Sequence, residues 1–186
     1  MSVDTAKARL SRDPPRSTLV LGGARSGKSA HAEALAAAAG QPIYLATGAA
    51  RDAEMADRIA LHRARRGPAW TTIEEPLDLT GALAGACAPG RAVVVDCLTL
   101  WLANLLGAER DAGAESERLI ALLPRLAGRL VFVSNEVGLG IVPENALARA
   151  FRDAQGRLNQ SVARAVETVV LVAAGLPIVL KQGPSP

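Results

Sequence analysis

The chain contains few aromatic residues and few cysteines. Phe, Trp and Tyr make up 3% of its 186 residues, and the two cysteines are Cys87 and Cys97. They are too far apart for a CxxC pair and have no second pair with which to complete a zinc site. We therefore expect both to be small buried apolar side chains, and an oxidising compartment is disfavoured.

Long hydrophobic runs and a strong charge imbalance are also absent. No apolar run approaches the roughly 20 residues that are needed to span a bilayer. With 21 basic and 18 acidic residues the net charge is +3, and the arginines are scattered apart from Arg63, Arg65 and Arg66. Nucleic-acid binding usually needs clustered positive charge and stacking aromatics. We therefore expect a cytoplasmic protein with no membrane anchor and no nucleic-acid partner.

The length and the apolar content suit one folded domain. Hydrophobic residues make up 49% of the sequence, which is enough for one sizeable core but, over 186 residues, not for two comfortable ones. Residues 1–16 carry charges and the pair Pro14-Pro15, and they lack the apolar core of a signal peptide. We expect a disordered N-terminal tail over residues 1–16 and a single domain over residues 17–186.

A glycine-rich motif follows the first apolar run. Residues 18–21 read TLVL, and residues 22–29 read GGARSGKS before an alanine-rich, helix-compatible segment. This order of strand, loop and helix is typical of a phosphate-binding loop. Backbone N–H groups and the helix N-terminus would face the phosphates, Lys28 would contact the β and γ phosphates, and Ser29 would hold Mg²⁺. The motif predicts binding of a nucleoside triphosphate and leaves the reaction open.

Apolar patterns predict the remaining elements. Buried strands are expected at residues 43–46, 92–96 and 130–133, and shorter strands near 70–73, 169–172 and 178–180. Helices are expected at residues 53–66, 77–86, 98–106 and 115–126, with a last long helix from Pro143 to about residue 167. The predicted fold is α/β and P-loop NTPase-like, with a mostly parallel central sheet flanked by helices. The short strands could pair at either edge.

An aspartate ends the most apolar of these runs. Asp96 follows Val93-Val94-Val95 and would emerge at the carboxyl edge of a central strand. At that edge it could hold Mg²⁺ together with Ser29, directly or through water. The alternative is that Asp96 caps a helix or forms a turn.

One histidine stands out by its surroundings. On the predicted helix at residues 53–66, Met55, Ile59 and His62 share a face, and Arg63, Arg65 and Arg66 follow. A neutral imidazole could attack a phosphorus atom while arginines hold phosphate oxygens. The alternatives are a half-buried structural histidine and a solvated basic face. His31 has fewer supporting neighbours, and we interpret it as structural.

Other polar side chains follow predicted strands. Thr47 and Gly48 end the second strand at the edge where ligands collect in open parallel sheets. Glu74 and Glu75 could bind sugar hydroxyls or a guanine edge, although their spacing favours exposed ion pairing. The segment from Asn135 and Glu136 to Gly140 is a second candidate loop, where these two side chains could position an acceptor hydroxyl or a metal-bound water, or form an ordinary turn.

Four sequence blocks occur in order along the chain. They are GGARSGKSAHAE from Gly22, YLATGAARDAEMADRIALHRARR from Tyr44, VVVDCLTLW from Val93 and VSNEVGLGIVPEN from Val133. Together they resemble the bifunctional adenosylcobinamide kinase and adenosylcobinamide-phosphate guanylyltransferase family of cobalamin synthesis. The resemblance covers residues 18–181.

The resemblance implies two reactions. A triphosphate, ATP or GTP, would phosphorylate the aminopropanol hydroxyl of adenosylcobinamide. GMP would then pass from GTP to that phosphate, giving adenosylcobinamide-GDP and pyrophosphate, through a guanylylated histidine at the position of His62. Family members form homotrimers, which implies shared active sites.

The motifs and the resemblance together imply site residues. His62 and Lys28 would be catalytic, and Ser29 and Asp96 would hold the metal. The nucleotide-binding positions implied by the motif and the resemblance are Gly22, Gly23, Ala24, Arg25, Ser26, Gly27, Lys28, Ser29, Thr47, Gly48, Arg63, Ala64, Arg65, Arg66, Glu74 and Asp96. The chain departs from the family where Leu61 replaces a second histidine and where Asp96 stands for a glutamate of some members, and neither change removes required chemistry.

Two alternative functions are also consistent with the phosphate-binding loop. One is a simple small-molecule kinase in which His62 is structural. The other is a non-catalytic nucleotide switch whose loop at residues 135–140 contacts a protein partner.

Overall fold

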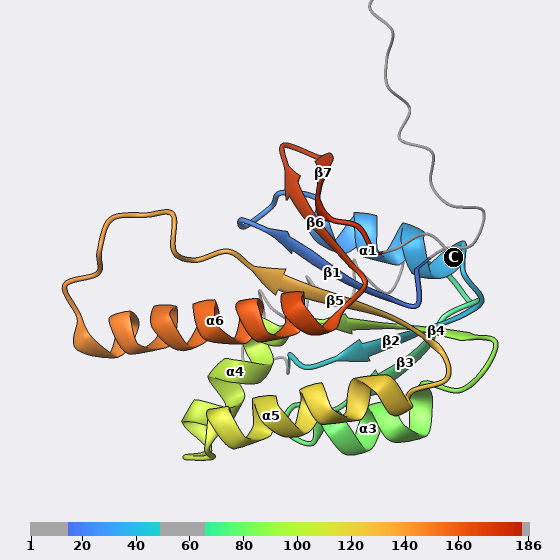
Figure 1. The fold of residues 1–186 in the computed structure, drawn as a ribbon, viewed down its shortest axis with the longest axis horizontal. Helices are drawn as coiled ribbons and strands as arrows, with labels where there is room; N and C mark the ends of the chain where they lie inside the picture. Colours follow the sequence, from blue (N-terminus) through green and yellow to red (C-terminus); the bar gives the residue numbers. More distant parts are fainter. Residues whose placement is uncertain (1–14, 49–65, 184–186) are drawn as a thin grey trace, which may run out of the picture.

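The described part of the chain is built around one seven-stranded sheet (Figure 1). This computed structural model describes residues 15–48 and 66–183. The strands are β1 (Ser17–Gly22), β2 (Gln41–Ala46), β3 (Thr71–Glu74), β4 (Arg91–Asp96), β5 (Arg129–Asn135), β6 (Thr168–Ala173) and β7 (Leu176–Lys181). The helices are α1 (Lys28–Ala37), α3 (Leu79–Ala86), α4 (Leu98–Gly107), α5 (Ala112–Leu122), the 3-10 helix η1 (Leu123–Arg125) and α6 (Ala146–Ala165).

The sheet topology confirms the predicted fold class. The strand order is β3-β2-β4-β5-β1-β6-β7, and every neighbouring pair is parallel except β6 and β7. The two short strands whose pairing the sequence left open lie at opposite edges. β3 pairs in parallel with β2, whereas β7 returns antiparallel to β6.

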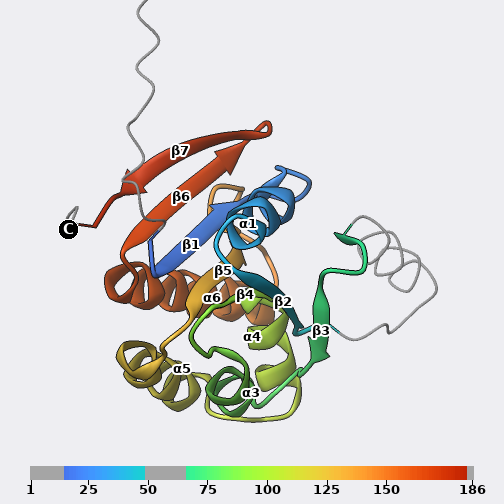
Figure 2. The same ribbon diagram turned by 90° about the vertical axis from the view of Figure 1, so that its right-hand side faces the viewer.

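Helices cover both faces of the sheet (Figure 2). α1 lies on one face, and α3, α4, α5 and α6 lie on the other. Side chains of one strand alternate between two cores: Leu19 packs on the α3 to α6 side, whereas Val20 packs with Ala32 and Ala36 of α1. Because both faces are covered, the inner strands are apolar along their whole length, which explains the continuous hydrophobic runs in the sequence.

The last long helix begins later than the sequence suggested. α6 starts at Ala146, and the Asn145 side chain accepts hydrogen bonds from the N–H groups of Leu147 and Ala148. The prediction that Pro143 opens the helix was wrong, because the asparagine satisfies the free N–H groups of the first turn. The carbonyl of Pro143 instead accepts a hydrogen bond of 2.8 Å from Arg149.

The predicted N-terminal tail overlaps the folded part by two residues. The backbone N–H of Arg16 donates to the Glu167 carboxylate at 2.7 Å, and its guanidinium donates to the Leu126 carbonyl at 3.1 Å. Pro15 accepts a hydrogen bond from Arg129. These contacts attach the chain to the sheet just before β1. The rest of the predicted tail lies outside the described residues, as does nearly all of the helix predicted at 53–66.

The cysteines and the helices can be compared with the sequence predictions. Both cysteines are free and buried, as predicted, with exposed fractions of 4% for Cys87 and 5% for Cys97. Across residues 15–48 and 66–183, none of the helices has the length and apolar character that crossing a membrane would require.

Replacing Asn145 by Ala removes both capping hydrogen bonds of α6 and lowers the free energy of unfolding by about 1 kcal/mol. Urea unfolding followed by circular dichroism measures the change. Glu144→Ala is the matched control, because Glu144 is the exposed neighbour and only its backbone carbonyl bonds Arg149. Equal stability of the two variants would contradict the capping role.

Candidate functional site

The phosphate-binding motif forms a loop between β1 and α1. β1 ends at Gly22 and α1 begins at Lys28, so residues 23–27 connect a strand end to a helix N-terminus. Gly27 has a φ of +95°, a left-handed conformation that favours glycine. The Lys28 ammonium donates to the carbonyl of Gly23 at 3.0 Å. The helix N-terminus and the lysine together supply positive charge at this loop.

Two features of the loop indicate a tightly built cradle. A Cβ at Gly22 would lie 2.4 Å from the Ser26 hydroxyl and 2.6 Å from the carbonyl oxygen of Val172, so the loop and β6 approach too closely for a side chain. Within the described residues, the Ser26 hydroxyl is buried and lacks a hydrogen-bond partner. Buried polar groups are nearly always satisfied, so this hydroxyl fits a loop that is completed by a ligand.

The parallel register brings further strand ends to the same edge. Gly22 lies opposite Asn135 of β5, and Asp96 of β4 lies between Ala46 of β2 and Val133 of β5. The N–H of Glu136 donates to the carbonyl of Gly22 at 3.2 Å, which ties the loop after β5 to the phosphate loop. The structure thus brings the motif of residues 22–29 and Asp96 to one edge of the sheet.

Asp96 has a defined partner at this edge. The half-buried carboxylate accepts a hydrogen bond of 2.8 Å from the hydroxyl of Tyr44 on β2. Burial of the ring, and then the neighbouring Asp96 charge, raise the pKa of Tyr44 well above its usual value. The tyrosine therefore stays protonated and donates this hydrogen bond at any physiological pH.

The donor set at this edge suits Mg²⁺ rather than a softer metal. Ser29 and Asp96 offer a hydroxyl and a carboxylate, which are hard oxygen ligands. Across residues 15–48 and 66–183, three or more His, Cys, Asp or Glu side chains nowhere gather in a way that could hold a metal. Mg²⁺ in phosphate sites usually takes one or two protein ligands and completes its shell with phosphate and water, so two ligands fit.

Thr47 has a structural role at the same edge. Its buried hydroxyl donates to the Cys97 carbonyl at 2.7 Å and accepts from the Cys97 N–H at 2.9 Å, and its own carbonyl accepts from Asn104 at 2.7 Å. These bonds lock the ends of β2 and β4 together. Gly48 packs closely, since a Cβ there would lie 2.8 Å from Leu100. Contact of the Thr47 hydroxyl with the nucleotide is disfavoured by these bonds.

Cys97 follows Asp96 but is not placed for nucleophilic chemistry. Burial, and then the neighbouring Asp96, raise the pKa of its thiol to about 11. The thiol is therefore protonated near neutral pH. Because the thiolate rather than the thiol is the nucleophile, Cys97 is not suited to nucleophilic catalysis.

Arg66 is buried rather than open to solvent. Its guanidinium carbon lies 3.5 Å from the centroid of the Tyr44 ring, and Nη1 lies 3.5 Å from Oε1 of Glu33 on α1. The side chains of Arg66 and Glu33 are 3% and 10% exposed. This burial disfavours the predicted direct contact of Arg66 with phosphate. The other members of the predicted histidine and arginine cluster, His62, Arg63, Ala64 and Arg65, lie outside the described residues.

The remaining candidates fall into two groups. Glu74 is exposed at the end of β3 beside Ala46, at the same sheet edge as Asp96. Glu75 instead accepts hydrogen bonds from the N–H groups of Leu77 and Asp78 and therefore forms a turn. Partial burial lowers the pKa of His31 on α1, so this imidazole is neutral near pH 7.

Asn135 and Glu136 are held by hydrogen bonds to α4 and α6 and within their own loop. The N–H of Asn135 donates to the Thr99 hydroxyl at 2.9 Å, and its carbonyl accepts from Asn159 at 3.1 Å. The Glu136 carboxylate accepts from the N–H of Gly138. The side-chain oxygen of Asn135 is buried and has no hydrogen-bond partner within the described residues. The turn is therefore well ordered by contacts with α4 and α6.

Sequence reasoning did not single out Tyr44 and Glu33. A signal for each exists in the sequence. Tyr44 is the one tyrosine of the chain, and the parallel register sets it beside Val94, two positions before Asp96. Glu33 is a carboxylate between the small residues Ala32 and Ala36 on the buried side of α1. A charge on a buried helix face normally requires a partner.

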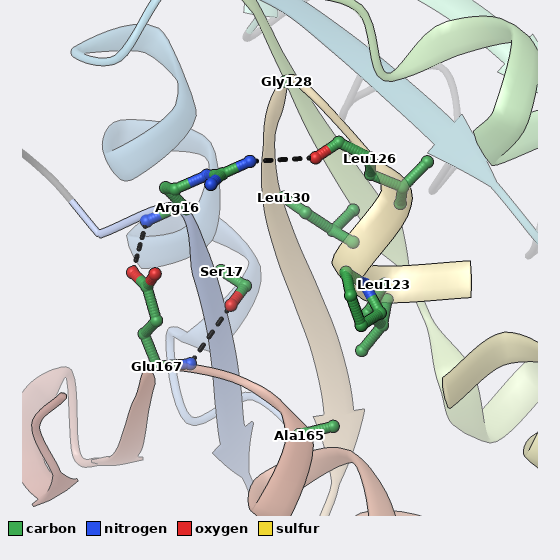
Figure 3. Close-up of a pocket in the computed structure, with 9 residues that line it drawn as sticks. Arg16, Ser17, Leu123, Leu126, Gly128, Leu130, Ala165 and Glu167 are labelled. Atoms are coloured by element: carbon green, nitrogen blue, oxygen red, sulfur yellow. Dashed lines mark hydrogen bonds between the residues drawn. The ribbon is translucent and has the colours of Figure 1, made fainter. Parts of the chain in front are cut away.

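A cavity of about 220 Å³ lies elsewhere (Figure 3). Its lining comes from the amino ends of β1 and β5 and from the ends of η1 and α6, at the sheet edge opposite Gly22 and Asp96. Arg16 and Glu167 on its wall bond each other, and Arg16 also bonds Leu126. These polar groups are satisfied by the protein itself, so we place the candidate site at the phosphate loop.

Comparison with known proteins gives a consistent match along the chain. The family described as cobinamide kinase / cobinamide phosphate guanyltransferase matches residues 18–180. The bifunctional adenosylcobalamin biosynthesis protein CobP of Pseudomonas aeruginosa is 50% identical, over 89% of this chain and 98% of the relative. The proteins named CobU in Escherichia coli and Salmonella typhimurium are 42% and 43% identical, each over 88% of this chain and 98% of the relative.

Solved structures show the same fold at low sequence identity. The flagellar accessory protein FlaH of Methanocaldococcus jannaschii has a TM-score of 0.51 and 14% identity, covering 94% of this chain and 82% of the other. An ATPase of a type III secretion system has a TM-score of 0.52 and 13% identity, covering 88% and 56%. These likenesses concern the fold alone.

Replacing Gly22 by Ala lowers both the melting temperature and the affinity for nucleotide, because the added methyl group collides with the Val172 carbonyl. Overpacking of this kind lowers the free energy of unfolding by about 1–3 kcal/mol. Thermal unfolding and titration with a fluorescent GTP analogue measure the two effects. Gly23→Ala is the matched control, since a Cβ there meets no atom within 4 Å. An equal loss of melting temperature in both variants would contradict the packing argument.

Proposed function

Since this chain belongs to the cobinamide kinase / cobinamide phosphate guanyltransferase family, we propose that it transfers GMP through a guanylylated histidine at His62. The chain is a kinase and guanyltransferase of cobalamin biosynthesis, as its family and relatives indicate. The acceptor is adenosylcobinamide, and the final products are adenosylcobinamide-GDP and pyrophosphate. The reactions take place in the cytoplasm.

The first reaction is phosphoryl transfer to an alcohol. The hydroxyl oxygen of adenosylcobinamide attacks the γ phosphorus of ATP or GTP, the hydroxyl proton is released, and the nucleoside diphosphate leaves. Catalysis of this step rests on holding the γ phosphate in line and neutralising its charge. Lys28 and the backbone N–H groups of residues 22–29 supply that charge and position.

The second reaction passes through the enzyme. A ring nitrogen of His62 attacks the α phosphorus of GTP, forming a P–N bond and releasing pyrophosphate. A phosphate oxygen of adenosylcobinamide phosphate then attacks the same phosphorus, the P–N bond breaks, and the imidazole is restored. A histidine with an unperturbed pKa of about 6.5 is largely neutral near pH 7, so a ring nitrogen can act as the nucleophile.

One observation carries this proposal. The phosphate loop, Lys28 and the Asp96 carboxylate meet at the carboxyl edge of one parallel sheet, in a chain whose family combines both activities. The chain order supports the role of His62, because residues 49–65 follow β2, which ends at that edge.

Mg²⁺ fits this site as a cofactor. Ser29 and Asp96 would hold it, and it would neutralise phosphate charge when bound. Glu74, exposed at the same edge, would bind hydroxyl groups of the nucleotide. Arg63 and Arg65 would bind phosphate oxygens of the GTP that His62 attacks.

The working assembly is a homotrimer. β7 is an edge strand of the sheet. It carries four apolar side chains that are 49% to 69% exposed, which are Leu176, Ile178, Val179 and Leu180. An exposed apolar edge strand of this kind is a ready template for pairing with another chain. The trimer places such a strand in contact with a neighbouring subunit.

Incubating the protein with GTP labelled at the α phosphate produces a protein-bound GMP that is labile in acid and stable in base, as expected of a P–N bond. His62→Ala abolishes the label, whereas phosphorylation of adenosylcobinamide persists. His31→Ala is the matched control, because His31 is the other histidine of the chain and keeps the label. Denaturing gels and scintillation counting measure the adduct.

Two results would count against this chemistry. If the GMP label persists in His62→Ala, the nucleophile is a residue other than His62. Absence of label in the wild-type protein, with phosphorylation intact, leaves the simple kinase as the better description.

Light scattering coupled to size-exclusion chromatography gives a mass three times that of the 19.2 kDa chain. Replacing Ile178 and Leu180 together by Lys shifts the protein toward the monomer, because two charges on an apolar interface cannot be desolvated cheaply. Asp111→Ala, a cap of α5 on the surface, leaves the mass unchanged. A wild-type mass of one chain would refute the trimer.

A further inference from the structure

Four side chains form a continuous, largely buried chain on the α1 face of the sheet. They are Glu33 on α1, Arg66 just before β3, Tyr44 on β2 and Asp96 at the end of β4, and we call them the Tyr44 network. The network belongs to the α1 face of the sheet, where Tyr44 packs with Ala32, Ala36 and Val94. It connects the helix of the phosphate loop to the carboxylate at the sheet edge.

The Tyr44 ring is held by contacts with two neighbouring side chains, and its hydroxyl donates to Asp96. The Arg66 guanidinium carbon lies 3.5 Å from the ring centroid, and the Trp70 ring meets the tyrosine edge-on with centroids 6.3 Å apart. Tyr44 itself is 8% exposed. A ring held on its face and against its edge cannot rotate away, so its hydroxyl stays directed at Asp96, 2.8 Å away.

Arg66 is held from the other side by α1. Its Nη1 lies 3.5 Å from Glu33 Oε1, and both side chains are almost wholly buried. A buried guanidinium needs a negative partner and, here, also uses the face of an aromatic ring. The position of Arg66 is therefore coupled to α1, which starts at the phosphate loop.

We propose that Tyr44 and Arg66 are positioning residues that set the orientation of the Asp96 carboxylate for Mg²⁺ at the nucleotide site. Tyr44 acts through its hydrogen bond to Asp96, and Arg66 acts by holding the Tyr44 ring. This inference rests on the proposed role of Asp96 as a metal ligand. It assigns to Arg66 a role different from the direct phosphate contact that its place in the sequence suggested.

The physical basis is the fixing of a ligand by its hydrogen-bond partner. A carboxylate at a strand end has two rotatable bonds, and a metal binds well when one oxygen already points at it. Hydrogen-bond partners of metal ligands restrict that freedom, and their removal commonly weakens metal binding tenfold or more. Tyr44 satisfies Oδ2 of Asp96 and thereby restricts both bonds.

Tyr44→Phe is the direct test, because it removes one hydroxyl and keeps the ring that Arg66 and Trp70 contact. We expect the affinity for Mn²⁺, measured by the free-ion electron paramagnetic resonance signal with a non-hydrolysable ATP analogue bound, to fall about tenfold. The Mg²⁺ concentration that half-saturates phosphorylation rises by a similar factor. Binding of the same analogue in EDTA, without metal, stays at the wild-type value.

Three further variants separate positioning from general destabilisation. Asp96→Asn removes the ligand itself and weakens Mn²⁺ binding more than Tyr44→Phe. The double variant Glu33→Gln with Arg66→Met removes both buried charges together. It also lowers Mn²⁺ affinity, by a smaller factor than Tyr44→Phe does. Asp111→Ala loses two capping hydrogen bonds of α5, which lies on the face of the sheet opposite α1, and lowers the melting temperature without changing Mn²⁺ affinity.

The proposal is overturned if Tyr44→Phe binds Mn²⁺ as tightly as the wild-type protein or more tightly, whatever its melting temperature. Wild-type Mn²⁺ affinity in Asp96→Asn would overturn it as well. A failure of the guanylyl-histidine chemistry is distinguishable from both, because it appears as a missing GMP adduct, whereas the Mn²⁺ measurement needs only a bound nucleotide.

Discussion

The parallel register of the central strands is the constraint on which the site depends. Because β2, β4, β5 and β1 run in the same direction, their last residues meet along one edge. Gly22, Asp96 and Asn135 are far apart in the sequence and become neighbours only through this register. A shift of one strand by one residue would turn Asp96 to the opposite face, away from Tyr44 and α1.

Several hydrogen bonds hold that edge rigid before any ligand arrives. Thr47 fastens the end of β2 to Cys97, Glu136 fastens the loop after β5 to Gly22, and Tyr44 fastens Asp96. Phosphoryl transfer depends on positioning and on fixed charge rather than on covalent participation by many groups. A preformed edge with a glycine-lined loop meets that requirement, and the Tyr44 network extends it into the protein interior.

The sequence predicted the class of fold and the order of strand, loop and helix around residues 22–29, for identifiable reasons. Continuous apolar runs identify strands buried on both faces, and the spacing of glycine, lysine and serine in residues 22–29 has few other structural uses. It did not predict that Asn145 rather than Pro143 starts α6, because several residues near a helix start compete for the capping position. The roles of Arg66 and Thr47 depend on partners distant in sequence, such as Glu33 and Cys97, and no local pattern indicates such pairs.

The most direct measurement is a crystal structure of the protein with GTP and Mg²⁺ bound. It should place the β and γ phosphates against the N–H groups of residues 22–29 and Lys28, with the metal between Ser29 and Asp96 and the imidazole of His62 facing the α phosphorus. A nucleotide bound at the opposite sheet edge, in the cavity beside Arg16, would contradict this location of the site. An imidazole of His62 packed away from the bound nucleotide would contradict the transfer chemistry.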